Sequence, residues 1–362
     1  MSSPAVTVPV SLDLAAIRQA VETRLHEFID SKVRSATEGH TPMELTHLLE
    51  AFLFAGGKRL RPLLCVCGWH AATGSGDTDP LLNVAASLEM FHAFALIHDD
   101  VMDHSQLRRG RPTVHRALAA LHQADRDRTA ADDLGVSGAL LAGDLALVWS
   151  DEILHSAGLT PTQLAAALPV IHTMRNEVLH GQYLDLLATG RPTDDVDAAL
   201  RIIRFKTAKY TIERPLHLGA ALAGADSDVQ TALSAYALPI GEAFQLRDDL
   251  LGVYGAPGRT GKSVLEDIRD GKPTVLVALA LRQADPSQRA ILHAALGNPG
   301  LDQAQADIIR GILTATGAHA TVENMIETRF RQAVDPLDTG VFSPAATAAL
   351  RALAETAAWR DT

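Results

Sequence analysis

The chain has 362 residues, of which 47% are hydrophobic, 4% aromatic and 21% charged, and its formal net charge is −11. This length allows one large core or two ordinary domains, and the acidic balance argues against nucleic acid as a partner. The first ten residues lack the basic and apolar regions of a signal peptide, and no window reaches about 18 uncharged apolar residues. We therefore expect a cytoplasmic protein with no stable membrane insertion.

Helical patterns fill most of the chain and are broken by short Gly-, Pro- and Asp-rich stretches. After a lead over residues 1–10 that we expect to be disordered, the predicted helices are 11–35, 42–55, 60–73, 79–103, 112–123, 136–157, 161–189, 194–222, 226–252, 272–284, 286–296, 301–316, 318–333 and 343–359. Four of them begin at a capping residue followed by proline: Thr41-Pro42, Asp79-Pro80, Thr160-Pro161 and Ser343-Pro344. The charged stretch 124–134 has no apolar stripe and is expected to be an exposed loop.

The chain shows no sign of a second domain, since it has no alternating β pattern, no repeat and no change of composition. Abundant alanine and few aromatic residues favour helices over sheets. We predict a single all-α domain over residues 11–362, with its helices packed around a deep central cavity. Cys65 and Cys67 are two apart in a predicted helix and point away from each other, so no disulfide is expected.

Two aspartate clusters, Asp99-Asp100-Val101-Met102-Asp103 and Asp248-Asp249-Leu250-Leu251-Gly252, lie inside apolar helical patterns. Asp99 and Asp103 are four apart, so they project from one helix face, with Asp100 turned by about 100°. Buried carboxylates this close together are unfavourable unless cations compensate them. Carboxylate oxygens suit Mg²⁺, which commonly shares its coordination with substrate phosphates. Two such faces opposed across a helix bundle would hold Mg²⁺ ions and a diphosphate between them.

Two basic segments lie near these clusters. Gly56-Gly57-Lys58-Arg59-Leu60-Arg61-Pro62 separates two predicted helices, and is either an anion site at a helix start or an ordinary basic turn. Arg108-Arg109-Gly110-Arg111 follows the first cluster, and its arginines either bind an anion or pair with the carboxylates.

Single basic residues add to this pattern. Lys206, Lys262 and Lys272 each stand beside a small or polar residue, an arrangement more typical of exposed surface charges. His92 lies two helical turns before Asp99 on the same face. A lone histidine is more often a core residue, but between an aspartate cluster and a basic turn it is a candidate phosphate donor.

Residues 256–263 (APGRTGKS) fit a relaxed P-loop pattern, with alanine in place of the first glycine. A P-loop needs a buried strand before it and a helix after it, within a βαβ unit. Here an acidic helical pattern precedes the segment and no long helix follows, so we do not expect a nucleotide site.

Taken together, these segments resemble the trans-isoprenyl diphosphate synthases of the polyprenyl synthetase family. The order of motifs matches from Gly56 to Lys272: GGKRLRP, the His92 segment leading to LIHDDVMD, RRGRPTVH, LAGDLAL, GQYLDLL, FKTAKY, FQLRDDLLG and two GK dipeptides. The resemblance implies an all-α homodimer that condenses an allylic diphosphate head-to-tail with isopentenyl diphosphate. It also implies about three Mg²⁺ ions per active site, which act as Lewis acids on the leaving group.

The resemblance assigns the metal site to the two clusters. Asp99 and Asp103 would bind two Mg²⁺ ions and Asp248 a third, with Asp100 and Asp249 assisting. The second cluster ends in Gly252 where many members have a third aspartate; because the first position usually makes the metal contact, we expect activity to survive.

The resemblance also assigns residues to the binding sites of the two diphosphate substrates. Residues matching the allylic diphosphate site are Arg108, Lys206 and Lys262, with Lys272 assisting and Gln182 and Asp185 as a supporting pair. Residues matching a metal-free, all-cationic isopentenyl diphosphate site are Lys58, Arg61, His92 and Arg109. Thr207 and Gln245 match positions that flank the allylic cation, and the departing diphosphate would take the proton. The segment Ser263–Asp267 departs from the small, Asp-rich turn common in the family.

Phe94 and Ala95 bear on product length. Phe94 precedes Asp99 by more than one turn and points away from the metal ligands, where a growing chain must extend. A ring there resembles the floor of short-chain synthases, which predicts a geranylgeranyl (C20) product with farnesyl (C15) as the alternative. Two other functions are possible interpretations of the sequence. One is a class I terpene cyclase on the same scaffold, which would not need an isopentenyl diphosphate site. The other is a non-catalytic subunit of a synthase, a class that typically loses the aspartate clusters.

Overall fold

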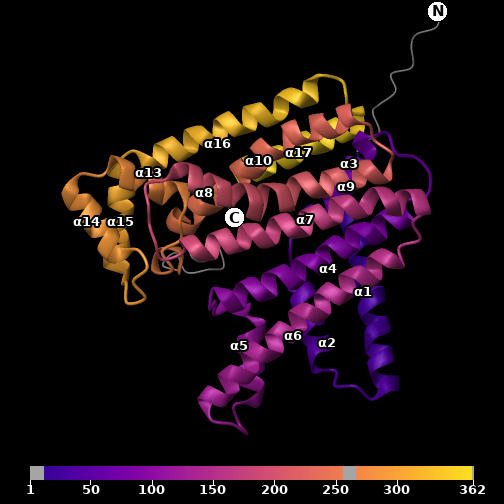
Figure 1. Ribbon diagram of the computed structural model, residues 1–362, viewed down its shortest axis with the longest axis horizontal. Helices are drawn as coiled ribbons and strands as arrows, with labels where there is room; N and C mark the ends of the chain where they lie inside the picture. The colour runs from indigo at the N-terminus through magenta and orange to yellow at the C-terminus, as the bar shows by residue number, and fades with distance from the viewer. Residues whose placement is uncertain (1–11, 256–265, 361–362) are drawn as a thin grey trace, which may run out of the picture.

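The computed structural model describes residues 12–255 and 266–360, and it is almost entirely helical (Figure 1). The predicted all-α class is therefore confirmed. The N-terminal half comprises α1 (Leu14–Gly39), α2 (Glu44–Leu53), α3 (Leu60–Ala71), α4 (Asp79–Met102), α5 (Val114–His122), α6 (Arg128–His155) and α7 (Pro161–Ala188). The C-terminal half comprises α8 (Val196–Ile202), a π-helical segment η1 (Ile203–Glu213), α9 (Arg214–Leu222), α10 (Ser227–Tyr254), α12 (Glu266–Arg269), α13 (Val275–Gln283), α14 (Pro286–Ala295), α15 (Gln303–Ala315), α16 (Ala318–Val334), a 3₁₀ turn (Asp335–Asp338) and α17 (Pro344–Trp359).

Two of the four predicted capping residues are confirmed. Thr160 forms a capping box with Gln163, and the Ser343 hydroxyl accepts a bond from the backbone of α17. The other two predictions were wrong by a few residues, because α2 begins only at Glu44 and Asp79 already lies inside α4.

The prediction of an exposed loop over 124–134 was wrong for its second half. The carboxylate of Asp127 accepts a bond from the amide of Ala130 and starts α6 at Arg128. The charges of this stretch face outward, while the small residues Ala131 and Gly135 are buried. Gly135 lies against the carbonyl of His115 in α5, so small residues rather than an apolar stripe hold the two helices together.

Two further features differ from the predicted elements. A two-residue antiparallel ladder, β1 (Leu107–Arg108) with β2 (Arg111–Pro112), precedes α5, whose predicted start at 112 shifts to Val114. The predicted helix 194–222 is divided by the π-helical segment η1, which carries the candidate site residues Lys206 and Thr207.

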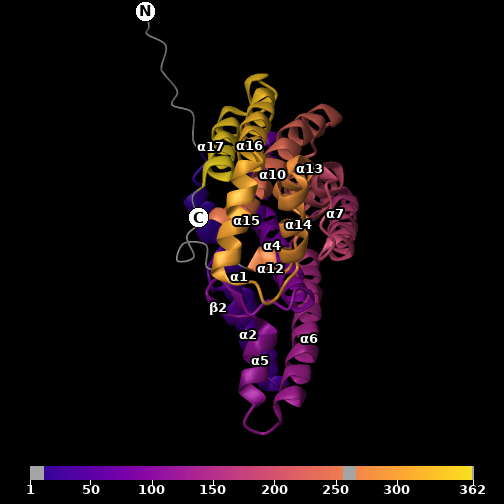
Figure 2. The same ribbon diagram turned by 90° about the vertical axis from the view of Figure 1, so that its left-hand side faces the viewer.

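The hydrophobic core is made of two clusters. One is built mainly from α10, α13, α15, α16 and α17 and includes Tyr236, whose hydroxyl donates to the Leu350 carbonyl at 2.8 Å. The other is built mainly from α1, α4, α6 and α7 and includes Leu25 and Met90. Viewed end-on, the C-terminal helices stack above the N-terminal ones (Figure 2). Helix α3 contributes to both clusters, and Cys65 and Cys67 are buried there as free thiols.

Helix α4 is long and apolar enough to cross a membrane, and it alone passes that test among the helices of residues 12–255 and 266–360. Other helices bury 67% of its most apolar window. A core helix passes the same test, so this is weak evidence for a membrane span.

Candidate active site

A cavity of about 600 Å³ lies between the two core clusters. Its walls come from the start of α3, the second half of α4, α7, η1 and α10. Fourteen of the predicted site residues line it together: Lys58, Arg61, His92, Phe94, Ala95, Asp99, Arg108, Arg109, Gln182, Lys206, Thr207, Gln245, Asp248 and Lys272. The deep central cavity predicted for the bundle is thus present.

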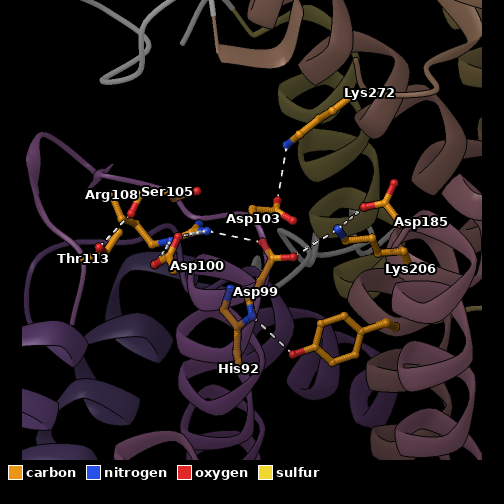
Figure 3. Close-up of polar contacts among 11 residues, drawn as sticks. His92, Asp99, Asp100, Asp103, Ser105, Arg108, Thr113, Asp185, Lys206 and Lys272 are labelled. Carbon is orange, nitrogen blue, oxygen red and sulfur yellow. Dashed lines mark hydrogen bonds and ion pairs between the residues drawn. The ribbon is translucent and has the colours of Figure 1, made fainter. Parts of the chain in front are cut away.

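The first aspartate cluster ends α4 and is surrounded by cations (Figure 3). Lys206 Nζ lies 3.1 Å from Asp99 Oδ1 and 2.6 Å from Asp185 Oδ2. Lys272 Nζ lies 3.7 Å from Asp103 Oδ2. These contacts join residues from α4, α7, η1 and the loop before α13. The cations offset the unfavourable free energy of placing several carboxylates close together in a partly buried site.

The two outer aspartates of this cluster differ in acidity. Burial favours the neutral form of Asp99, but Lys206 and Arg108 outweigh burial and hold its pKa below the usual value. Burial and the neighbouring charge of Asp99 instead raise the pKa of Asp103.

Asp100 has a different surrounding from its neighbours. It is 1% exposed and does not line the cavity. Arg108 binds it with two contacts of 2.7 Å, from Nε to Oδ2 and from Nη2 to Oδ1. The structure therefore gives Asp100 the role of fixing Arg108, whose guanidinium also reaches Asp99 Oδ2 at 3.4 Å.

The second cluster lies on α10 across the cavity. The Thr207 hydroxyl donates to Gln245 Oε1 at 2.8 Å, and Gln245 Nε2 donates to Asp249 Oδ1 at 2.9 Å. Asp248 lines the cavity and is ion-paired with Arg360, just after α17. Arg360 could not be predicted from the sequence, because it lies more than a hundred residues beyond its partner.

The carboxylates fit Mg²⁺ only in combination with a ligand. Within residues 12–255 and 266–360, no three Asp, Glu, His or Cys side chains converge closely enough to hold a metal by themselves. Mg²⁺ is usually bound through one or two carboxylates together with substrate phosphates and water, which is what Asp99, Asp103 and Asp248 can offer. Nearby, Gln182 Nε2 is a buried donor with no hydrogen-bond partner among the described residues, and it is well placed for a ligand oxygen.

The π-helical segment sets the position of Lys206 and Thr207 on the cavity wall. Helices α7 and α10 approach its backbone at two glycines. A Cβ on Gly181 would lie 2.5 Å from the amide nitrogen of Lys206, and one on Gly241 would lie 2.5 Å from Ala208 Cα. Only glycine permits these approaches, which hold the segment between the two helices.

A second group of cations lies at the start of α3 and the end of β1. The guanidinium of Arg61 stacks over the Tyr210 ring at 4.3 Å and donates to the Thr211 hydroxyl at 2.7 Å. Arg109 donates to the Gly56 carbonyl. Burial lowers the pKa of the Lys58 ammonium, and the charge of Arg360 adds to this effect.

His92 lies beneath this group, with its Nδ1 3.2 Å from the Tyr210 hydroxyl. Burial, followed by the charge of Arg61, lowers the pKa of His92 well below its usual value. The imidazole is therefore neutral at pH 7. Lys58, Arg61 and Arg109 therefore carry the fixed positive charge of this group, and His92 adds a polar imidazole beside them.

Two residues of this pocket were missed from the sequence. Tyr210 is 3% exposed, and burial raises its pKa to about 12. Arg59 is also 3% exposed and binds Glu89 at 2.7 Å and the Leu53 carbonyl at 2.7 Å. Glu89 stands alone in an apolar stretch of α4, and such a carboxylate would have been the available signal for an inward-facing arginine.

The far end of the cavity is apolar. Phe94 is 7% exposed, and its ring centroid lies 5.2 Å from that of Phe91. Val178, Leu179 and Leu186 of α7 also line the cavity with apolar side chains. A hydrocarbon chain attached to a diphosphate at Asp99 would have apolar walls to follow.

Some predicted features lie outside the described residues. They are Lys262, the relaxed P-loop pattern, the lead over residues 1–10, and the start of the segment Ser263–Asp267.

Comparison with known proteins agrees with this geometry. Residues 42–313 match the model of the polyprenyl synthetase family. The chain is 35% identical over 249 residues to geranylfarnesyl diphosphate synthase of Aeropyrum pernix, covering 67% of this chain and 72% of that protein. It is 33% identical over 291 residues to geranylgeranyl diphosphate synthase of Saccharolobus solfataricus, covering 80% and 79%.

Solved structures are similar over nearly the whole chain. Geranylgeranyl pyrophosphate synthase from Corynebacterium glutamicum, complexed with isoprenyl diphosphate and magnesium, is 41% identical with a TM-score of 0.92, covering 96% of this chain and 100% of that one. Polyprenyl synthase from Caulobacter crescentus, complexed with calcium and isoprenyl diphosphate, is 27% identical with a TM-score of 0.78, covering 96% and 97%. The predicted enzyme class is confirmed: the chain belongs to the polyprenyl synthetase family and is a short-chain trans-prenyl diphosphate synthase.

Proposed function

We propose that this protein condenses an allylic diphosphate head-to-tail with isopentenyl diphosphate, in a Mg²⁺-dependent reaction, and that its main product is geranylgeranyl diphosphate (C20). The observation that carries the proposal is that one cavity has two polar ends of different charge. The end at Asp99 and Asp248, with Asp103 paired to the lining residue Lys272, is rich in carboxylates, whereas the end at Lys58, Arg61 and Arg109 is cationic. A carboxylate-rich end can bind a diphosphate only through cations, and a cationic end can bind one directly.

The residues at the carboxylate-rich end and in the middle of the cavity have different proposed roles. Mg²⁺ held by the aspartates would supply electrostatic stabilisation of the diphosphate as it leaves. Lys206, Arg108 and Lys272 supply fixed positive charge on the same side. The hydroxyl of Thr207 and the amide of Gln245 face the cavity between the two ends, where a developing allylic cation would meet oxygen atoms.

The C20 product is supported by the apolar end of the cavity and by two of the relatives. Phe94 closes the α4 side of that end while Ala95 beside it leaves room. Geranylgeranyl synthases are among the similar proteins, and a farnesyl diphosphate synthase of Mycobacterium tuberculosis is 34% identical over 256 residues. Farnesyl diphosphate (C15) therefore remains the alternative product.

The function is tested by incubating the purified protein with Mg²⁺, labelled isopentenyl diphosphate and each of the C5, C10 and C15 allylic diphosphates. We expect label to enter a linear C20 diphosphate. A cyclic hydrocarbon formed from one diphosphate, with no label incorporated, would instead indicate a terpene cyclase.

Replacing Phe94 with alanine is expected to lengthen the main product by at least one isoprene unit. Removing the ring opens space beyond the floor that it forms against Phe91, and a growing apolar chain gains contacts there. The check is product analysis in the same assay. An unchanged C20 product from a folded Phe94→Ala variant would refute the floor assignment.

We also propose that the protein is a homodimer built through α6 and α7. Large apolar side chains on these two helices are more exposed than a monomer surface favours: Val136, Leu140, Leu141, Val148 and Leu187. Leu179, Tyr183 and Leu186, which also line the cavity, add to this exposed apolar area. Light scattering should give twice 38.6 kDa, about 77 kDa. Leu141→Asp should give the monomer mass and Leu121→Asp, equally exposed but on α5, should not; a monomeric wild-type protein would contradict the proposal.

A further inference from the structure

His98 has no assigned part in the reaction, although it lines the cavity one residue before Asp99. It lies one turn after Phe94 on α4, and the two rings meet edge to face with centroids 4.8 Å apart. The side chain is 21% exposed. It therefore stands between the aspartate cluster and the floor, on the path that the growing chain would take.

The ring is held against α6 and away from the centre of the cavity. Its Nε2–H donates to the Leu140 carbonyl at 3.0 Å, and the Asp144 carboxylate lies 3.6 Å from the same nitrogen. This nitrogen is thus turned to α6, not to the cations around Asp99. The geometry does not suit His98 as a metal ligand through that atom.

Gly143 makes this position possible. A Cβ on Gly143 would lie 2.2 Å from His98 Cδ2 and 2.3 Å from His98 Nε2, and its three nearest neighbours are all atoms of this one ring. The imidazole fills the place that any side chain at residue 143 would need. A larger residue there would force the ring off α6, and the open space beside it is the cavity.

We propose that His98, seated on Gly143 and bonded to the Leu140 carbonyl, is a specificity-determining residue that forms the side wall of the apolar channel ahead of Phe94. The width of the channel is then set jointly by residues of α4 and α6, and product length depends on both the floor and this wall. The inference rests on the proposed function, because it needs a growing prenyl chain in the cavity.

Three variants test it in the primer assay with labelled isopentenyl diphosphate. His98→Ala removes the wall and is expected to shift the main product from C20 to a longer chain. Gly143→Ala drives the ring into the cavity and is expected to shift the product to a shorter chain, with a raised KM for the C15 primer. Gly138→Ala is the matched control, because this glycine is on the same helix but faces Leu118 of α5, and it should still give C20.

The double variant His98→Ala/Gly143→Ala guards against loss of folding. It removes the ring that supplies the three nearest atoms to the new methyl group among the described residues, so its unfolding temperature should match that of His98→Ala, and its product should be the longer chain. The inference is overturned if His98→Ala, folded and active, still makes C20, or if the double variant keeps the shorter product of Gly143→Ala. A wild-type protein that incorporates no isopentenyl diphosphate would instead refute the proposed function itself.

Discussion

Replacing Asp99 with asparagine should lower kcat by about 10³-fold, equivalent to about 4 kcal/mol of transition-state stabilisation. The amide has the shape of the carboxylate but no charge, so it cannot hold a cation against the leaving diphosphate. Asp99 is also where Lys206 and Arg108 converge, at 3.1 and 3.4 Å. The loss should appear in kcat at saturating substrates, measured as incorporation of labelled isopentenyl diphosphate.

Two controls separate this effect from a general loss of structure. Asp133→Asn, on the exposed side of α6, should keep the wild-type rate. The unfolding temperature of Asp99→Asn should stay close to that of the wild type, because Lys206 retains its contact with Asp185 at 2.6 Å. A rate within tenfold of the wild type would contradict the assignment of Asp99 as a metal ligand.

The parts of the site that could be predicted from the sequence are those with local signals. The spacing of Asp99 and Asp103 on one helical turn, and the basic residues beside glycines at 56–61 and 108–111, are visible without knowledge of the fold. The structure brings these segments to one cavity, as the family resemblance implied.

What could not be predicted depends on contacts between distant segments. The π-helical segment that presents Lys206 has an ordinary helical sequence pattern, and its wider turns pack closely against Gly181 and Gly241. The inward turn of Arg59 depends on Glu89, and the position of Arg360 depends on Asp248. No local pattern marks either arginine among its basic neighbours.

The helix at 128–134 shows a limit of a different kind. Periodicity of large apolar residues is the usual signal for a buried helix face, but α6 packs there through Ala131 and Gly135. Small residues bury little area, so the charged residues between them dominated the pattern. The backbones of α5 and α6 pack closely at Gly135, and no stripe of large apolar residues marks this contact in the sequence.

Removing the metal should weaken the binding of only one of the two diphosphate substrates strongly. The cavity end at Asp99 and Asp103 carries several carboxylates, which repel a diphosphate unless divalent cations lie between them. The end at Lys58, Arg61 and Arg109 needs no such bridge, because its fixed charges are positive. Chelation should therefore weaken binding of an allylic diphosphate by about 100-fold or more, about 2.7 kcal/mol, and change that of isopentenyl diphosphate by less than about threefold.

Calorimetric titration with and without EDTA measures this difference directly. The ligands are isopentenyl diphosphate and a thiolo analogue of the allylic diphosphate that does not react, each added alone to the wild-type protein. Arg61→Gln supplies the complementary comparison, since it should weaken the binding of isopentenyl diphosphate both with and without EDTA. The account predicts that EDTA weakens binding of the allylic analogue by about 100-fold or more and leaves binding of isopentenyl diphosphate nearly unchanged; an equal loss for both ligands would contradict it.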